Sequence, residues 1–162
     1  MTDTAFDRPD VVVFPPVIPL ATLLLACVLQ WLAPLGWIAD LDTPVRVGLG
    51  LVIALAGLVT TSAGRRALVK NGTNVNPSLP TTRLVTDGMY GHTRNPLYVG
   101  VSVALCGTAL IFDLDWMPLV IIPGCIFLHF AVVKREERYL EQKFGDVYRR
   151  YKARVPRYFA GS

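Results

Sequence analysis

The chain has 162 residues, of which 52% are hydrophobic and 17% are charged. Ordinary soluble domains carry about 25% charged residues, and a small soluble protein could not bury so much apolar surface. Disordered chains are poor in apolar residues, so the composition excludes both classes and indicates an integral membrane protein. The net charge of +4 would suit a nucleic-acid partner, but the placement of the basic residues gives another explanation.

Four apolar segments follow one another along the chain. The first is long enough to cross about 30 Å of hydrocarbon. In the second, the small residues Gly50, Ala54 and Gly57 favour close approach of another helix. The last two are short for complete spans and are joined by a tight turn, which predicts a helical hairpin. The segments cover residues 17–39, 45–63, 97–112 and 116–133.

The distribution of basic residues predicts how these segments are oriented. The connections 40–44 and 113–115 contain Asp but no Lys or Arg, whereas the connection 64–96 and the tail 134–162 contain most of the basic residues. Positive residues stay on the cytoplasmic side of a membrane. We therefore expect cytoplasmic N- and C-termini and, because the chain is short, a bacterial inner-membrane protein. This topology explains the basic charge, so no nucleic-acid partner is expected.

The C-terminal tail carries an apolar stripe at helical spacing, formed by Leu140, Phe144, Tyr148, Tyr151 and Val155. Basic residues surround the stripe, which predicts an amphipathic helix that lies along the membrane surface or caps the bundle. Gly145 precedes Asp146 and breaks the pattern into two helices, with Asp146 as the N-cap of the second.

The predicted fold is an all-α membrane helical bundle with about four transmembrane spans and a cytoplasmic C-terminal amphipathic helix. We divide it into a two-helix membrane portion, residues 1–63, and a half that carries the polar segments, residues 64–162. The three cysteines, Cys27, Cys106 and Cys125, are expected to be buried thiols. No metal-ligand spacing occurs, so no metal is expected.

A polar segment at residues 81–100, TTRLVTDGMYGHTRNPLYVG, precedes the third apolar segment. Proline favours the first position of a helix, so a helix is expected to begin at Pro96, with Asn95 extended before it. Arg94 then lies at a helix N-terminus, where backbone amides and the guanidinium both attract an anion. As an alternative, Arg94 is an ordinary positive residue on the cytoplasmic side.

Two adjacent carboxylates, Glu136 and Glu137, directly follow the fourth apolar segment. One interpretation is a solvated helix face that pairs with nearby basic residues. The other is a binding site, because a carboxylate at the end of the hydrocarbon needs a cationic or multiply donating partner. We expect Glu136 to have a bound ligand as that partner, or Arg94 when no ligand is bound. His92 and Glu137 are weak candidates for a general base.

The order of these motifs carries a family resemblance. The pattern L-V-x-x-G-x-Y-x-x-x-R-N-P-x-Y-x-G precedes the hairpin, and E-E-x-x-L-x-x-x-F-G-x-x-Y-x-x-Y-x-x-x-V-P follows it. Together they resemble the isoprenylcysteine carboxyl methyltransferase family and are similar to the related phospholipid methyltransferases. The resemblance covers about residues 72–158. The eukaryotic enzymes have R-H-P where this chain has R-N-P, which leaves the acceptor open.

The resemblance implies a membrane methyltransferase that uses S-adenosylmethionine, in a pocket near the cytosolic face. The acceptor would be lipid-like or isoprenylcysteine-like and methylated on a carboxyl oxygen. Arg94 and Glu137 are our candidate catalytic residues. The residues that the resemblance places at the cofactor are Thr82, Arg83, Leu84, Val85, Tyr90, Asn95, Pro96, Leu97, Tyr98 and Glu136.

Three alternatives stay open from the sequence. The first is a phospholipid N-methyltransferase, which keeps the reaction class but moves the methyl group to an amine. The second is a steroid-reductase-like membrane oxidoreductase that uses NADPH, and the Glu136–Glu137 pair argues against it. The third is a non-catalytic membrane subunit. The expected partners in the main interpretation are the lipid bilayer and a lipophilic acceptor.

Overall fold

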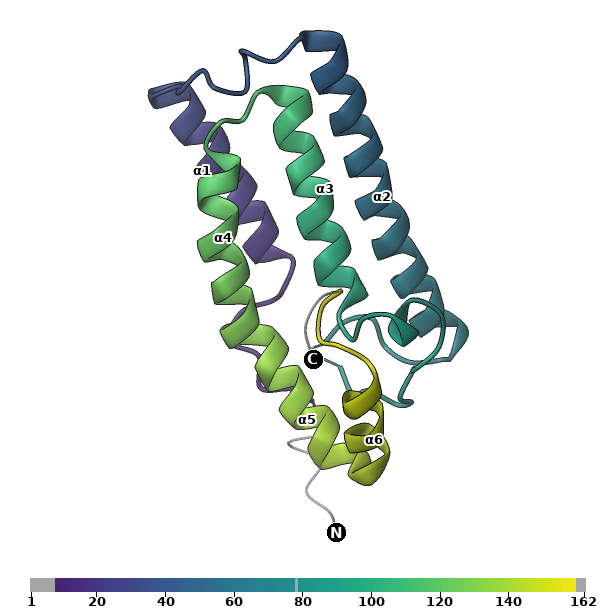
Figure 1. Ribbon diagram of the computed structural model, residues 1–162. Helices are drawn as coiled ribbons and strands as arrows, with labels where there is room; N and C mark the ends of the chain where they lie inside the picture. The colour runs from purple at the N-terminus through teal and green to yellow at the C-terminus, as the bar shows by residue number, and fades with distance from the viewer. Residues whose placement is uncertain (1–7, 78, 160–162) are drawn as a thin grey trace.

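The computed structural model describes residues 8–77 and 79–159, and within these ranges the chain is helical and contains no strand. The predicted all-α class is thereby confirmed. In Figure 1 the long helices lie side by side, and the shorter C-terminal helices lie at the lower end. In chain order the elements are α1 (Val17–Leu32), α2 (Thr43–Lys70), the 3-10 helix η2 (Gly88–Gly91), α3 (Pro96–Phe112), α4 (Met117–Leu128), the π-helical segment η3 (His129–Val133), α5 (Lys134–Phe144) and α6 (Asp146–Arg154).

The first two helices differ in length from the apolar segments that predicted them. α1 ends at Leu32 rather than at residue 39, because Pro34 disfavours a helical predecessor and Gly36 adopts a positive φ of 83°. α2 begins after Asp42, whose carboxylate caps it, and continues to Lys70. The division proposed between residues 63 and 64 falls inside α2, and it stays a prediction about which half carries the function.

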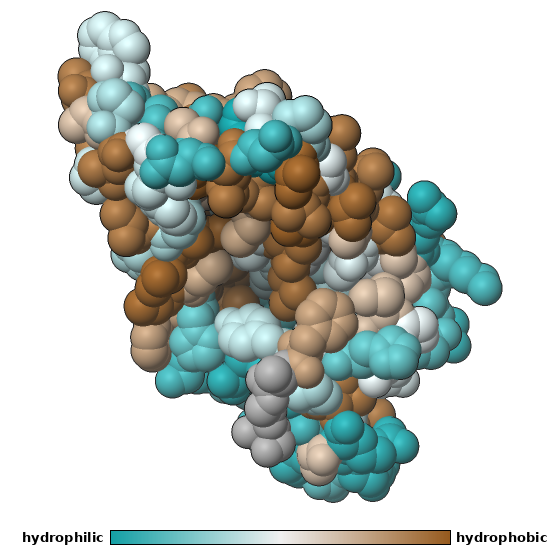
Figure 2. Space-filling model, turned by 45° about the horizontal axis from the view of Figure 1, so that its top comes forward, coloured by the Kyte–Doolittle hydropathy of each residue, from teal (hydrophilic) through white to brown (hydrophobic). Residues whose placement is uncertain are grey.

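Two continuous helical stretches are long and apolar enough to cross a membrane: Thr43–Lys70 and Met117–Phe144. Only 17% and 22% of their most apolar windows are buried inside the protein, so these helices point most of their apolar side chains outward. Figure 2 shows hydrophobic side chains over the middle of the molecule and hydrophilic ones toward its ends. α1 and α3 have 16 and 17 residues, and four complete spans stay a prediction.

All three cysteines are exposed on this outward apolar surface. The expectation that they are buried was therefore wrong. A thiol is a small apolar group, and its presence in an apolar run does not distinguish a side chain that faces the protein interior from one that faces lipid.

Glycine residues bring α2 and α3 into close contact. Gly50 and Gly57 of α2 lie against Gly107 and Gly100 of α3, and a Cβ at Gly50 would come within 2.9 Å of the Gly107 carbonyl oxygen. A Cβ at Gly107 would collide with the backbone of Gly50 and Ala54. Small residues permit such packing in lipid, as the sequence predicts for this segment.

Replacing Gly107 by Ala is expected to destabilise the protein by about 1–3 kcal/mol, because backbone atoms of α2 must move to admit the methyl group. Gly48→Ala is the matched control, since nothing lies within 4 Å of a Cβ at that α2 position. There alanine should raise stability by about 0.5–1 kcal/mol through helix propensity. Thermal unfolding in detergent micelles measures both. Equal melting temperatures for the two variants would contradict the close α2–α3 contact.

At the end of the bundle away from α5 and α6, acidic residues connect the helices. The Asp115 carboxylate is 1% exposed and links the α3–α4 turn to the α1–α2 connection. Its donors are Gln30 Nε2 at 2.9 Å, Gly36 N at 2.8 Å and Ile38 N at 2.9 Å. In the same turn Asp113 pairs with Arg46 at 2.6 Å. These aspartates therefore hold the helix connections together.

The C-terminal tail forms two helices that break at Gly145, where φ is 52°. The break is as predicted, but the cap is not. Gly145 occupies the N-cap position, and Asp146 begins α6 and pairs with Arg149 instead. The apolar stripe packs inward, since Tyr148 and Tyr151 are buried together with Val155. Figure 1 places α5 and α6 beside the connection between α2 and α3, so the tail caps the bundle.

Candidate active site

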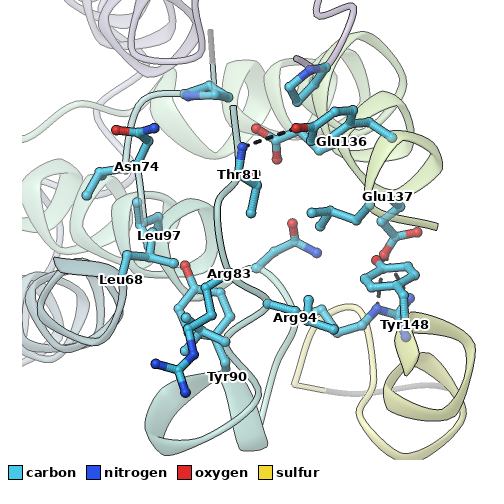
Figure 3. A pocket seen from close by; sticks show the side chains of 18 of the residues that line it. Leu68, Asn74, Thr81, Arg83, Tyr90, Arg94, Leu97, Glu136, Glu137 and Tyr148 are labelled. Carbon is cyan, nitrogen blue, oxygen red and sulfur yellow. Dashed lines mark hydrogen bonds and ion pairs between the residues drawn. The ribbon is translucent and has the colours of Figure 1, made fainter. Parts of the chain in front are cut away.

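A polar cavity lies at the end of the bundle where the start of α3 meets the α2–α3 connection, α5 and α6 (Figure 3). The cavity and the open space at its mouth together have about 810 Å³. Most of the predicted site residues line it: Arg83, Leu84, Val85, Tyr90, Arg94, Asn95, Leu97, Tyr98, Glu136 and Glu137.

Two predicted residues do not line the cavity. The Thr82 hydroxyl donates to the Gly72 carbonyl oxygen at 2.9 Å, which fixes the connection against the end of α2. Pro96 begins α3, as predicted, but its ring is fully buried and lies against Gly64 of α2. Both side chains are in positions that support the site rather than face it.

The cavity also has walls that were not predicted as site residues. They are Leu68, Asn74, Val75, Thr81, Tyr139, Leu140, Tyr148 and Tyr151, together with Pro9 and Pro77. Asn74 belongs to the stretch where the family resemblance begins, and this signal was available from the sequence. Tyr148 and Tyr151 belong to the apolar stripe of the tail, whose inward orientation the sequence left open. Tyr139 accepts a hydrogen bond from the Thr81 amide at 3.1 Å.

The Arg94 side chain is only 7% exposed and is fully engaged by the protein. Its Nε and Nη2 donate to Glu137 Oε1 at 3.1 and 2.8 Å. Its Nη1 donates to the carbonyl oxygens of Lys152 and Val155. Figure 3 shows Arg94 reaching toward Glu137. Each guanidinium nitrogen therefore already has a protein acceptor.

The Glu137 carboxylate joins Arg94 to a second arginine. Arg157 donates to it from Nε and Nη2, the latter at 2.7 Å. Burial alone would raise the pKa of Glu137, but the hydrogen bonds from Arg157 and Arg94 hold it below its usual range. Glu137 is thus an anion between two cations. The catalytic roles of Arg94 and Glu137 stay predictions, and these contacts favour positioning over acid–base chemistry.

Hydrogen bonds to backbone carbonyl oxygens hold the segment 155–158 against the start of α3. The Arg94 amide donates to the Pro156 carbonyl oxygen at 3.0 Å. The side chains of Thr93 and Asn95 both donate to the Arg157 carbonyl oxygen, at 3.0 and 3.1 Å. The motif at residues 93–96 is therefore bound to the far end of the chain.

Glu136 has a different environment from its neighbour. Its Oε1 accepts a hydrogen bond from the Tyr98 hydroxyl at 2.7 Å. No ion pair of Glu136 occurs in the part of the chain that the structure describes, so the expected pairing with Arg94 was wrong. Burial raises the pKa of Glu136 to about 7, although the Tyr98 hydrogen bond opposes the shift. A partly buried carboxylate that borders a cavity and has no cationic partner among the described residues suits a cationic ligand.

Two groups at the cavity suit an anion. Arg83 is exposed and borders the cavity. Among the ion pairs of the described residues, none involves Arg83. At the start of α3, Leu97 and Tyr98 also line the cavity, and the first amides of a helix point at a bound anion. The cavity therefore combines an anionic and a cationic side. In the described residues no group of His, Cys, Asp and Glu forms a potential metal site.

The sequence model of a protein family, phospholipid methyltransferase, matches residues 45–147, which are more than half of the chain. The chain belongs to the phospholipid methyltransferase family. The match runs from α2 into the first turn of α6 and includes most of the cavity walls. Tyr148, Tyr151 and Arg157 lie beyond it.

Two curated proteins are similar to parts of the chain. The chain is similar to protein-S-isoprenylcysteine O-methyltransferase of Schizosaccharomyces pombe, at 34% identity over 74 residues, which are 45% of this chain and 31% of that protein. It is also 44% identical over 46 residues to an uncharacterized protein of Haemophilus influenzae, which are 28% of this chain and 70% of that protein. The match thus spans about a third of the fission-yeast relative. No solved structure matches the chain.

The family and the fission-yeast relative point to a membrane methyltransferase of the isoprenylcysteine or phospholipid type. Two helical stretches carry apolar side chains on their outer faces, which is typical of a membrane protein.

Proposed function

We propose that the protein transfers a methyl group from S-adenosylmethionine to a lipophilic acceptor in the membrane. The observation that carries this proposal is the polar cavity at the end of an apolar helical bundle. Glu136 lies on one side of this cavity and forms no ion pair with any described residue. The expected location is a bacterial inner membrane with the cavity at the cytoplasmic face.

The residues around the cavity fit this cofactor. Its ammonium group or ribose hydroxyls would be held by Glu136, since charge-assisted hydrogen bonds are strong. Its carboxylate would be held by Arg83 and the amides at the start of α3. The faces of Tyr90 and Tyr98 suit a sulfonium as they suit other cations. Apolar walls for the adenine come from Leu84, Val85 and Leu97.

When bound, S-adenosylmethionine supplies a methyl group that is already activated by the sulfonium. The protein's task is therefore to hold and align the reactants, because alignment lowers the barrier of an in-line displacement. In this arrangement Arg94, Glu137 and Arg157 fix the segment 155–158 beside the cavity. We infer that they position the cavity wall and take no proton from the acceptor.

Two acceptors remain as candidates. The name of the fission-yeast relative favours a carboxylate of the isoprenylcysteine type, which needs no general base. The matched family favours the amine of a phospholipid, which must lose a proton before it attacks. We place the carboxylate first, because among the described residues that line the cavity Glu136 is the only carboxylate without an ion-pair partner, and we assign it to the cofactor.

Isothermal titration of the purified protein with S-adenosylmethionine and, separately, with NADPH tests the cofactor. Binding of the first and not the second is the expected result. Transfer of radiolabelled methyl groups into membrane extracts, followed by separation of lipid from protein products, then identifies the acceptor class. Binding of NADPH alone would favour an oxidoreductase, and failure to bind either cofactor would favour a non-catalytic subunit.

The proposed orientation is tested by cysteine labelling from outside the cell. Cys27, Cys106 and Cys125 are first replaced by Ser. Leu41→Cys, in the exposed α1–α2 connection, should then react with a membrane-impermeant maleimide in intact cells, whereas Arg150→Cys, exposed on α6, should react only after lysis. The reverse labelling pattern would overturn the proposed orientation.

A further inference from the structure

A second cavity, which the sequence did not predict, lies between α1, α3 and α4. Together with the open space at its mouth it has about 770 Å³. Leu97 and Tyr98 line both this cavity and the polar one. The two cavities therefore meet at the start of α3, with Tyr98 between them and its hydroxyl held by Glu136.

The walls of this second cavity offer almost no free polar group. The Thr22 hydroxyl donates to the Ile18 carbonyl oxygen at 2.9 Å, and the Thr61 hydroxyl donates to that of Leu97 at 3.5 Å. The Tyr98 hydroxyl donates to Glu136, and the Ser102 hydroxyl contacts the Cys125 sulfur at 3.6 Å. Water needs two to four polar partners to settle in a cavity. The cavity therefore suits an aliphatic occupant better than water or a polar ligand.

The length of the cavity follows from the helix positions that line it. On α3 the wall runs from Leu97 to Leu105, which is about 12 Å at 1.5 Å per residue. Leu105 and Ile121 also pack against the buried cluster of Ala26, Ala109, Leu114 and Met117, so the cavity ends there. An extended chain advances about 1.25 Å per carbon, given C–C bonds of about 1.5 Å. Roughly ten carbons therefore fill this length.

We propose that this cavity holds an aliphatic chain of the methyl acceptor, of about ten carbons in line, with its reactive head at Tyr98. Leu105 and Ile121 set the length. This inference rests on the proposed function, because the polar cavity must hold the methyl donor. Membrane lipid is as apolar as the cavity, so the cavity contributes little affinity to a chain that enters from the bilayer. The cavity instead selects for chain length, because only a chain that fits its length places its reactive head beside Tyr98.

Photolabelling in lipid nanodiscs tests the inference directly. The probes are decyl and hexadecyl alcohols that carry a diazirine at the end of the chain, and the adducts are mapped by mass spectrometry. The decyl probe is expected to label Leu105 or Ile121 at the closed end. The hexadecyl probe should label these residues at least about tenfold less, because its end overshoots the cavity. Decyl adducts confined to outward-facing residues such as Leu119 would overturn the inference.

Three variants sharpen the result. Ser102→Phe fills the middle of the cavity and should reduce decyl labelling of Leu105 and Ile121 about tenfold or more, with labelling of Leu119 unchanged. Leu105→Ala frees space for only a few more carbons, so it should let a dodecyl probe with the same terminal diazirine label the closed end. Leu119→Ala, at an exposed α4 position, is the matched control and should not. Equal labelling of the closed end in wild type and Ser102→Phe would also contradict the inference.

Titration with S-adenosylmethionine in the same nanodiscs separates this inference from the proposed function. Ser102 does not line the polar cavity, so Ser102→Phe should bind the cofactor with unchanged affinity. Labelling of the closed end without cofactor binding would overturn the proposed function and leave the chain site standing. Cofactor binding without such labelling would overturn the chain site alone.

Discussion

Replacing Glu137 by Gln is expected to lower the free energy of unfolding by about 3–5 kcal/mol, the usual cost of removing one partner from a buried ion pair. The reason is that the Arg94 side chain, 7% exposed, and Arg157 would both lose their counter-charge. For a chain of this size the loss corresponds to a fall in melting temperature of about 6–20 °C. Thermal unfolding in micelles, followed by tryptophan fluorescence, measures it.

Glu141→Gln is the matched control for this experiment. Glu141 lies on the same helix and pairs with Lys152, but both side chains are about a third or more exposed. Such surface pairs contribute about 0–1 kcal/mol, so the control should melt close to wild type. If Glu137→Gln also melts like wild type while methyl transfer is lost, Glu137 acts in catalysis and the positioning role is wrong.

The pH dependence of stability gives an independent check on Glu137. Its pKa is held below the usual range in the folded protein by Arg157 and Arg94, against the effect of burial. A carboxylate with a depressed pKa contributes stability at neutral pH that is lost as the pH falls through its folded-state pKa. Glu137→Gln should therefore reduce the loss of stability of the protein in acid.

The features that were predictable from the sequence are those that depend on neighbours in the chain. Pro96 begins α3 because its ring fixes its own φ, and Gly145 ends α5 because glycine readily adopts a positive φ. Close packing of α2 on the face of Gly50, Ala54 and Gly57 was predictable because residues four or seven apart share a helix face, but the identity of its partner α3 was not. The motifs at residues 94–98 and 136–137 were expected at one end of the bundle, and all of these residues except Pro96 line one cavity.

The partner of Arg94 was not predictable in the same way. Adjacent residues on a helix point about 100° apart, so Glu136 and Glu137 cannot face the same group. Which of them meets Arg94 depends on the rotation of α5, and the π-helical segment before it changes that rotation. Arg157, the second partner of Glu137, is twenty residues further along the chain. Only the folded tail brings these groups together.

The second cavity was also beyond the sequence. Its walls come mainly from α1, α3 and α4. In the sequence, the apolar residues that line it cannot be distinguished from residues that face lipid or pack in the core. The space arises from how three helices diverge. This divergence depends on packing elsewhere, such as the glycine contact of α3 with α2.

The affinity for S-adenosylmethionine is expected to rise with pH in the wild-type protein and to depend on Glu136. The pKa of this carboxylate is raised to about 7 by burial. A cationic ligand binds the ionised form, so affinity should increase from about pH 6 to about pH 8 as the proton leaves. Glu136→Gln should bind about 10- to 150-fold more weakly at the higher pH, for the loss of about 1.5–3 kcal/mol. Its affinity should show no rise around neutral pH.

The stability of the ligand-free protein should change in the opposite direction. A carboxylate whose folded-state pKa is raised from 4.5 to about 7 binds more protons when folded than when unfolded. Its contribution to stability is therefore lost as the pH rises through this range. Glu136→Gln should remove this loss, while Glu141→Gln, at a surface pair, should leave both profiles unchanged.

Tyr98→Phe extends the test, because it removes the hydroxyl that donates to Glu136 at 2.7 Å. That hydrogen bond lowers the pKa of Glu136, so the rise in cofactor affinity should move to higher pH in this variant. Calorimetric titration across the pH range measures all three proteins. Wild-type affinity that is flat through neutral pH and equal to that of Glu136→Gln would show that Glu136 does not bind the cofactor's cation. The assignment of the cavity's cationic side would then be wrong.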